Sequence, residues 1–147
     1  MTSTLASISA PIRVPDRLAV GLLDTSVVID LQCLGPEQLP EQVAVSAVTM
    51  AELAAGPSAT NDADERARRQ DRLQRAEAAF DPLPFGVQAA RAYGRVHAAV
   101  LQAGREPRAR FADLLIAAVA LAEGLPLLTR NPVDFVGLES LINVVEV

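Results

Sequence analysis

Three carboxylates stand alone within apolar stretches of this chain. Asp113 interrupts an apolar run over residues 111–122, Asp24 follows the apolar residues 18–23, and Glu52 lies within the largely apolar residues 44–55. Burying a carboxylate in such surroundings is costly unless a partner compensates its charge. Three isolated acids of this kind suggest one shared partner, and we expect that partner to be a cation.

A fourth carboxylate, Asp134, lies in the loop that follows residues 125–129. In open parallel sheets, ligands collect outside the carboxyl ends of the strands, where both Asp24 and this loop are expected. Crowded carboxylates repel one another unless divalent cations neutralise them, and oxygen-only ligands select Mg²⁺ or Mn²⁺. Two such ions about 4 Å apart can activate a water for attack on a phosphodiester. The acids therefore predict a hard-metal site suited to phosphodiester hydrolysis.

Apolar segments of two lengths alternate along the chain and indicate alternating strands and helices. We expect strands near residues 18–23, 42–46, 125–129 and 143–147. Hydrophobic spacing and helix-breaking residues predict helices over residues 25–34, 47–55, 64–79, 87–103 and 111–123. This order predicts an α/β fold, a three-layer sandwich with a central, mainly parallel sheet.

Two of these helices carry expectations for single residues. Thr25 or Ser26 is the expected N-cap of the first helix, which Leu31 and Leu34 continue as far as Gly35. In the helix over residues 87–103, the expected buried stripe consists of Val87, Ala90, Tyr93, Val96, Val100 and Ala103.

Composition excludes several kinds of site. The 147 residues are 50% hydrophobic, which fits one domain over residues 18–147, with residues 1–17 as a flexible N-terminal extension. Aromatic residues make up only 3%, so stacking platforms for unpaired bases are scarce. The single Cys33, expected to be buried, excludes an internal disulfide. All 13 basic residues are Arg, which removes Schiff-base chemistry and a P-loop lysine.

Charge and hydropathy point to a soluble, cytoplasmic protein without a membrane span or a secretory signal. The net charge of −5 argues mildly against nonspecific nucleic-acid binding. The helix over residues 64–79 interleaves Arg with acids and is expected to be a solvated face. Arg108 and Arg110, which precede Asp113, are better candidates for an RNA phosphate contact or for holding the acids together.

Four segments in a fixed order resemble a known family, the PIN-domain ribonucleases, and within it the VapC-type toxins of type II toxin–antitoxin systems. The segments are residues 22–30, 45–56, 112–120 and 127–135, and the resemblance covers about residues 19–147. It implies a PIN-like fold for the domain. It also implies a Mg²⁺-dependent endoribonuclease, in which a cluster of acids holds the metal that activates a water.

The resemblance assigns roles residue by residue. Asp24, Glu52 and Asp113 match the three principal metal-binding acids of the family, and Asp134 or Asn131 matches the fourth position, with Asp134 favoured. Thr129 and Asn131 would then support the ligands or bind water. Ser26 matches a small hydroxyl residue that could hydrogen-bond the Asp24 carboxylate or the attacking water.

The resemblance also implies partners. These are an RNA substrate, a cognate VapB-like antitoxin, and either a homodimer or a toxin–antitoxin hetero-oligomer. The alternative function is a catalytically silent PIN-like binding module, against which the retention of four acids argues. A phosphatase of the haloacid-dehalogenase type is excluded, because Ser26 stands where its second Asp belongs and the chain has no Lys.

Overall fold

A four-stranded parallel sheet forms the centre of the protein, whose computed structural model describes residues 17–147. The strands β1 (Val20–Leu23), β2 (Gln42–Val45), β3 (Leu127–Thr129) and β4 (Val144–Glu146) lie in the order β2-β1-β3-β4. Every pairing between neighbours is parallel. This arrangement confirms the predicted α/β fold. The expected extension before residue 18 lies, apart from Arg17, outside the described residues.

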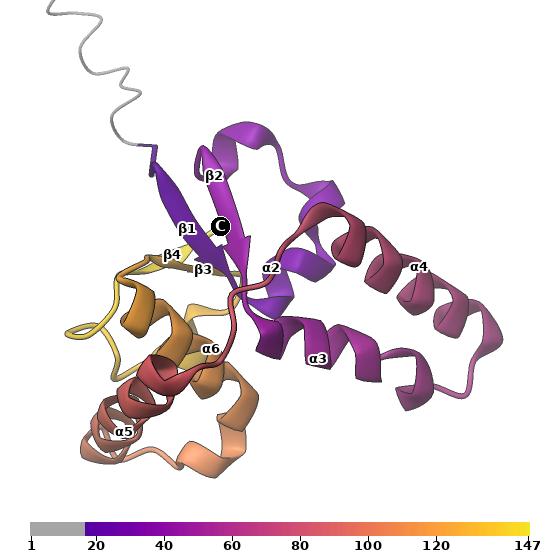
Figure 1. The fold of residues 1–147 in the computed structure, drawn as a ribbon. Coiled ribbons are helices and arrows are strands. Elements are labelled where there is room, and N and C mark those ends of the chain that lie inside the picture. Colours follow the sequence, from indigo (N-terminus) through magenta and orange to yellow (C-terminus); the bar gives the residue numbers. More distant parts are fainter. Residues whose placement is uncertain (1–16) are drawn as a thin grey trace, which may run out of the picture.

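Successive residues of the strands point to opposite faces of the sheet, and each face has its own apolar core. Leu22 and Leu127 belong to one core, whereas Leu23 and Leu128 belong to the other, and all four are almost fully buried. Helices α5 (Val87–Gln102) and α6 (Phe111–Glu123) cover the first face. Helices α2 (Thr25–Ile29), α3 (Ala47–Ala55) and α4 (Ala63–Ala79) contribute to the second core, and α3 and α4 run side by side away from the sheet (Figure 1).

Helix α2 is shorter than the sequence predicted, and a different residue caps it. Asp24, not Thr25 or Ser26, is the N-cap, because its extended backbone brings Oδ1 to 3.1 Å from the amide nitrogen of Val27. The chain leaves α-helical geometry at Asp30 and continues as a separate 3₁₀ turn over Leu31–Cys33. Cys33 is exposed on this turn, so the expectation that it is buried was wrong.

The buried stripe of α5 is displaced from the predicted one. Val96 and Val100 are buried as expected, but the other buried positions are Ala89 and Ala92, whereas Val87 is 66% exposed. Small alanines fit where α5 packs closely against α6 over the sheet. The larger Val87 lies in the first turn of α5, and there it stays in solvent.

Helix α6 occupies the predicted residues, because its sequence favours burial along most of its length. Leu114 and residues 116–120 are buried. The helix ends at Gly124, whose φ of +67° is left-handed and therefore suits glycine. Despite this apolar character, no helix within residues 17–147 is both long and apolar enough to cross a membrane.

Candidate functional site

The carboxyl ends of β1 and β3 form the crevice where the predicted acids were expected. These two central strands are neighbours, but the chain leaves them toward opposite faces of the sheet. After β1 it enters α2, which packs in the second core; after β3 it passes through the 3₁₀ turn Pro132–Phe135, whose Phe135 packs in the first core. A crevice between strands that diverge in this way is the usual ligand site of a parallel sheet.

Asp24 stands at the end of β1 and is held rigidly. It is 3% exposed, and its amide nitrogen donates to the carbonyl oxygen of Leu128 across the sheet. Its Oδ1 accepts hydrogen bonds from the amide of Val27 and from Ser26 Oγ, the latter at 2.5 Å. Ser26 Oγ in turn accepts from the amide of Arg130 at 3.0 Å. The expected hydrogen bond from Ser26 to Asp24 is therefore present, and it also ties α2 to the loop after β3.

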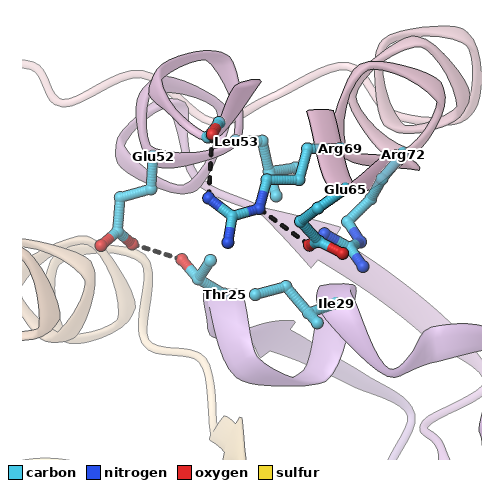
Figure 2. Close-up of a pocket in the computed structure, with 8 residues that line it drawn as sticks. Thr25, Ile29, Glu52, Leu53, Glu65, Arg69 and Arg72 are labelled. Carbon is cyan, nitrogen blue, oxygen red and sulfur yellow. Dashed lines mark hydrogen bonds and ion pairs between the residues drawn. The ribbon is translucent and has the colours of Figure 1, made fainter. Parts of the chain in front are cut away.

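Glu52 reaches the same region from α3. Its Oε1 accepts a hydrogen bond of 2.5 Å from Thr25 Oγ1 (Figure 2). Thr25 Oγ1 also lies 3.1 Å from Thr49 Oγ1. Because the Thr25 proton points to Glu52, the Thr49 hydroxyl donates to Thr25. The sequence analysis did not assign these two threonines to the site, although Thr25 directly follows Asp24 and Thr49 lies one helical turn before Glu52.

Asp113 is the acid whose pKa the other three acids affect. Burial raises its pKa most, the neighbouring charges of Asp134, Glu52 and Asp24 also raise it, in that order, and Arg110 lowers it in part; together these effects bring the pKa to about 6. These interactions place all four predicted acids close together. Asp24 and Glu52, from the first half of the chain, and Asp134, from its last segment, therefore all interact with Asp113.

Asp134, the fourth acid, forms an ion pair within the site. Arg110 Nε lies 2.9 Å from Asp134 Oδ1, so the arginine neutralises the fourth acid and leaves Asp113 without an ion pair of its own. Asp134 is also the acid with the strongest effect on the pKa of Asp113. This favours Asp134 over the exposed Asn131 as the fourth acidic position.

Thr129, Arg108 and Asp30 have separate surroundings. Thr129 is fully buried, and its Oγ1 accepts a hydrogen bond from the amide of Asn131 at 3.0 Å. Arg108 is exposed, and its own amide donates to Glu106 in the turn before α6. Asp30, which sequence reasoning left out of the site, pairs with Arg130 at 3.5 Å at the end of α2. These contacts give Thr129 a role in shaping the loop and place Arg108 outside the acidic crevice.

A pocket of about 280 Å³ opens beside Glu52, between α2, α3 and α4. Arg69 projects into it from α4 opposite Thr25 and Glu52 (Figure 2). Its guanidinium donates to Glu65 at 2.9 Å and to the carbonyl oxygen of Gly56 at 3.0 Å. The acidic crevice thus continues on one side into a groove with a basic wall.

The donor set fits a hard cation, but the side chains are not arranged as a finished ligand shell. No three Asp, Glu, His or Cys side chains within residues 17–147 are gathered closely enough to hold one metal ion. The reason is visible in the contacts: Glu52 is turned to Thr25, and Asp134 is turned to Arg110. Binding a cation at all four acids would therefore require these two side chains to exchange partners.

Comparisons with known proteins agree with this architecture. A family model described as the PIN domain matches residues 21–135. "Ribonuclease VapC5" of Mycobacterium tuberculosis is 38% identical over 129 residues, which cover 86% of this chain and 93% of the relative. "Ribonuclease VapC8" of the same species is 38% identical over 105 residues, which cover 71% of this chain and 93% of the relative.

The solved structures give the same result. The crystal structure of VapBC-5, a member of the VapBC family of toxin–antitoxin systems from Mycobacterium tuberculosis, matches with a TM-score of 0.77 and 37% sequence identity. The match covers 88% of this chain and 99% of that one. Because the family model spans more than half of the chain and VapC5 matches most of both sequences, this chain belongs to the PIN domain family, in its VapC branch.

Proposed function

We propose that this chain is a Mg²⁺-dependent endoribonuclease that acts as the toxin of a toxin–antitoxin pair. The observation that carries the proposal is the crevice in which a half-buried Asp113 lies near three other carboxylates, while Arg110 is paired with one of them. Such an excess of negative charge favours a divalent cation. The names of the relatives support the choice of substrate, since VapC5 and VapC8 are called ribonucleases.

Asp24, Glu52, Asp113 and Asp134 are the residues that would hold Mg²⁺, with Mn²⁺ as the alternative ion. When bound, the metal would neutralise the phosphodiester oxygens and increase the acidity of a water. Ser26 and the amide of Val27 keep Asp24 in one orientation. Thr25 holds Glu52 toward the crevice, and Arg110 keeps Asp134 at its edge. Asp24 is thus already oriented for an ion, whereas Glu52 and Asp134 would exchange their present partners for it.

Cleavage of total cellular RNA by the purified chain tests this function. We expect discrete fragments with Mg²⁺ or Mn²⁺, and none with EDTA or with Asp113→Asn. Asp81→Asn is the matched control, because Asp81 is exposed and outside the crevice. Retained cleavage by Asp113→Asn would contradict the site. The absence of cleavage with either metal, from folded protein free of antitoxin, would favour the silent binding module.

The partner proposed with this function is a VapB-like antitoxin, since VapBC-5 is described as a toxin–antitoxin system. A second pocket of about 180 Å³ lies between α2 and the end of α4, and it shares Ile29 and Arg72 with the pocket beside Glu52. Together they form a groove with apolar walls and arginines along α4. Ile29 is 45% exposed in this groove. A chain segment with apolar and acidic residues fits such a surface and would end near the catalytic acids.

Capture from the native cells tests the partner. The tagged chain should recover one small protein, and Ile29→Asp should lose it, because a buried carboxylate would disrupt the apolar contact. Val87→Asp is the matched control, since Val87 is exposed on the far helix α5. Recovery of this chain alone would contradict the antitoxin, and sedimentation of the recovered material distinguishes a homodimer from a hetero-oligomer.

A further inference from the structure

A further hollow, of about 460 Å³, shares no lining residue with the groove described above. It is formed by α5, the turn before α6 and the first residue of α6. Its lining includes none of the four acids of the candidate metal site and does not include Arg110. Its lining consists of Tyr93, His97, Leu101, Glu106, Pro107, Arg108 and Phe111.

Ring-bearing side chains gather in this hollow although the chain has few of them. The whole sequence contains four Phe, one Tyr, one His and no Trp, and three of these six rings lie here. The rings of Tyr93 and Phe111 meet edge to face at 6.0 Å, and Tyr93 contacts His97 at 5.8 Å. Phe111 is nevertheless 53% exposed. Tyr93 therefore fixes the Phe111 ring without covering it, as a stacking surface requires.

The hollow is close to the reacting acids. Phe111 and Asp113 lie two residues apart in the first turn of α6, which separates their Cα atoms by about 5 Å. Phe111 turns toward Tyr93 on α5, whereas Asp113 turns toward the other acids. A nucleotide whose phosphate lay at the acids would therefore have a neighbouring base within reach of Phe111.

Arg108 adds positive charge at the rim of this hollow. Within residues 17–147, no carboxylate lies within ion-pair distance of its guanidinium, in contrast to Arg110, which Asp134 engages. The one acid of the hollow, Glu106, accepts a hydrogen bond from the Arg108 amide and caps the turn before α6. The Arg108 side chain is thus free for a phosphate of the same strand.

We propose that this hollow holds an unpaired base of the RNA next to the cleaved phosphodiester, with Phe111 as the stacking ring and Arg108 as the phosphate contact. The inference rests on the proposed ribonuclease function and adds a subsite to it. Stacking tolerates every base, so the subsite selects single-stranded or splayed-out RNA and not one sequence.

Binding in EDTA tests the subsite separately from cleavage. The probes are a fluorescein-labelled uridine dodecamer and a dodecamer with the same backbone but no bases, and the readout is fluorescence anisotropy. We expect the wild-type chain to bind the uridine oligonucleotide about tenfold more tightly than the abasic one. Phe111→Ala should remove this preference, and Phe111→Tyr should retain it. Arg108→Gln should weaken binding of both oligonucleotides equally, because it removes a phosphate contact.

Val87→Ala is the matched control, since Val87, like Phe111, is an exposed apolar residue in the first turn of a helix but lies outside the hollow. Unchanged preference in folded Phe111→Ala would overturn the subsite. So would a dimer that Phe111→Ala dissociates without altering the preference, since the hollow would then bind a second copy of the chain. A Phe111-dependent preference in a chain that cleaves no RNA with any metal would instead contradict the proposed catalysis and leave the base-binding hollow in place.

Discussion

At the scale of single residues, the site depends on how each acid is compensated. Asp24 accepts two hydrogen bonds, Glu52 accepts one from Thr25, and Asp134 has an ion pair with Arg110. Asp113 has its charge opposed by burial and by all three of these acids, so it is the carboxylate that most favours protonation. A cation and a proton therefore compete for the same residue.

The first prediction concerns the pH dependence of stability in the metal-free protein. The pKa of Asp113 rises from 3.8 to about 6 on folding, so the folded state binds this proton more tightly than the unfolded state. Its contribution to the free energy of unfolding must therefore fall as the pH rises from about 4 to about 6, and stay constant above. Asp113→Asn should exceed the wild type by about 1–2 kcal/mol at pH 7.5, after allowance for solvent screening.

Urea denaturation in EDTA at several pH values measures this difference. The advantage of Asp113→Asn should shrink toward pH 4, where the wild-type carboxyl is protonated in the folded state. Asp81→Asn serves as the control and should show no such trend, since Asp81 is exposed. An advantage of Asp113→Asn that stays the same at every pH would contradict the assignment.

The second prediction concerns Ser26, whose hydroxyl joins Asp24 to the loop after β3. Ser26→Ala removes the donor to Asp24 and leaves the Arg130 amide without its acceptor, so the free energy of unfolding should fall by about 1–3 kcal/mol. The affinity for Mg²⁺ should fall about tenfold, because Asp24 loses its orientation. Calorimetric titration and thermal melting measure both effects, with the exposed Ser140→Ala as control. Equal metal affinity in Ser26→Ala would argue against this role.

The sequence indicated Asp24, Glu52 and Asp113 because they stand alone in or beside apolar segments, and it indicated Asp134 through the family resemblance; in the structure the other three acids all raise the pKa of Asp113. The sequence did not indicate how they are compensated. The pairing of Arg110 with Asp134 joins residues 24 positions apart, and the hydrogen bond from Thr25 to Glu52 joins residues 27 positions apart. Such partners depend on how the helices pack over the sheet, which no local pattern encodes.

At the scale of elements, most helix bounds were predicted, whereas the end of the first helix and the buried stripe of α5 were not. Residues 47–55 and 111–123 are helical as predicted. The first helix begins directly after β1, with Asp24 as its N-cap, and ends at Asp30, although Leu31 and Leu34 keep helical spacing. In α5 the first predicted and observed buried positions differ by one or two residues. Because alanines lie on both sides of the helix, the hydrophobic pattern does not distinguish the two stripes.

The third prediction compares two glycines that have open space around them. Gly94 lies inside α5 with an ordinary helical backbone, whereas Gly124 ends α6 with a φ of +67°. Gly94→Ala should raise the free energy of unfolding by about 0.5–1 kcal/mol, and Gly124→Ala should lower it by about 1 kcal/mol. Denaturant unfolding of the two variants provides the measurement. Shifts of the same sign would show that backbone conformation does not decide the outcome.

At the scale of the whole molecule, the net charge of −5 is distributed unevenly. Part of the negative charge is concentrated in the crevice, while α4 interleaves acids and arginines in internal ion pairs such as Arg69 with Glu65. Neutralising the crevice therefore removes repulsion from the folded state without altering the rest of the surface. Metal binding should accordingly be visible in global stability.

The fourth prediction is that Mg²⁺ raises the melting temperature, and does so less at low pH. A ligand that binds only the folded state stabilises it according to its concentration and affinity. Below pH 6, protons occupy Asp113 and compete with the cation. We expect a clear upward shift at pH 7.5 and a much smaller one at pH 5, measured by calorimetry. Asp113→Asn should show little shift at either pH, and an equal shift in both proteins would contradict the site.

The parallel sheet has a consequence for the time at which the acidic crevice can form. The central pair joins Leu22 to Leu127, and the Ser26 hydroxyl accepts from a residue 104 positions later. Contacts between such distant segments form late in folding, and a growing chain cannot form them at all until the later segment has left the ribosome. The acids of β1 and of the loop after β3 therefore cannot meet before residue 134 has been synthesised. A translation product that stops short of this loop therefore cannot assemble the acidic crevice, for a topological reason.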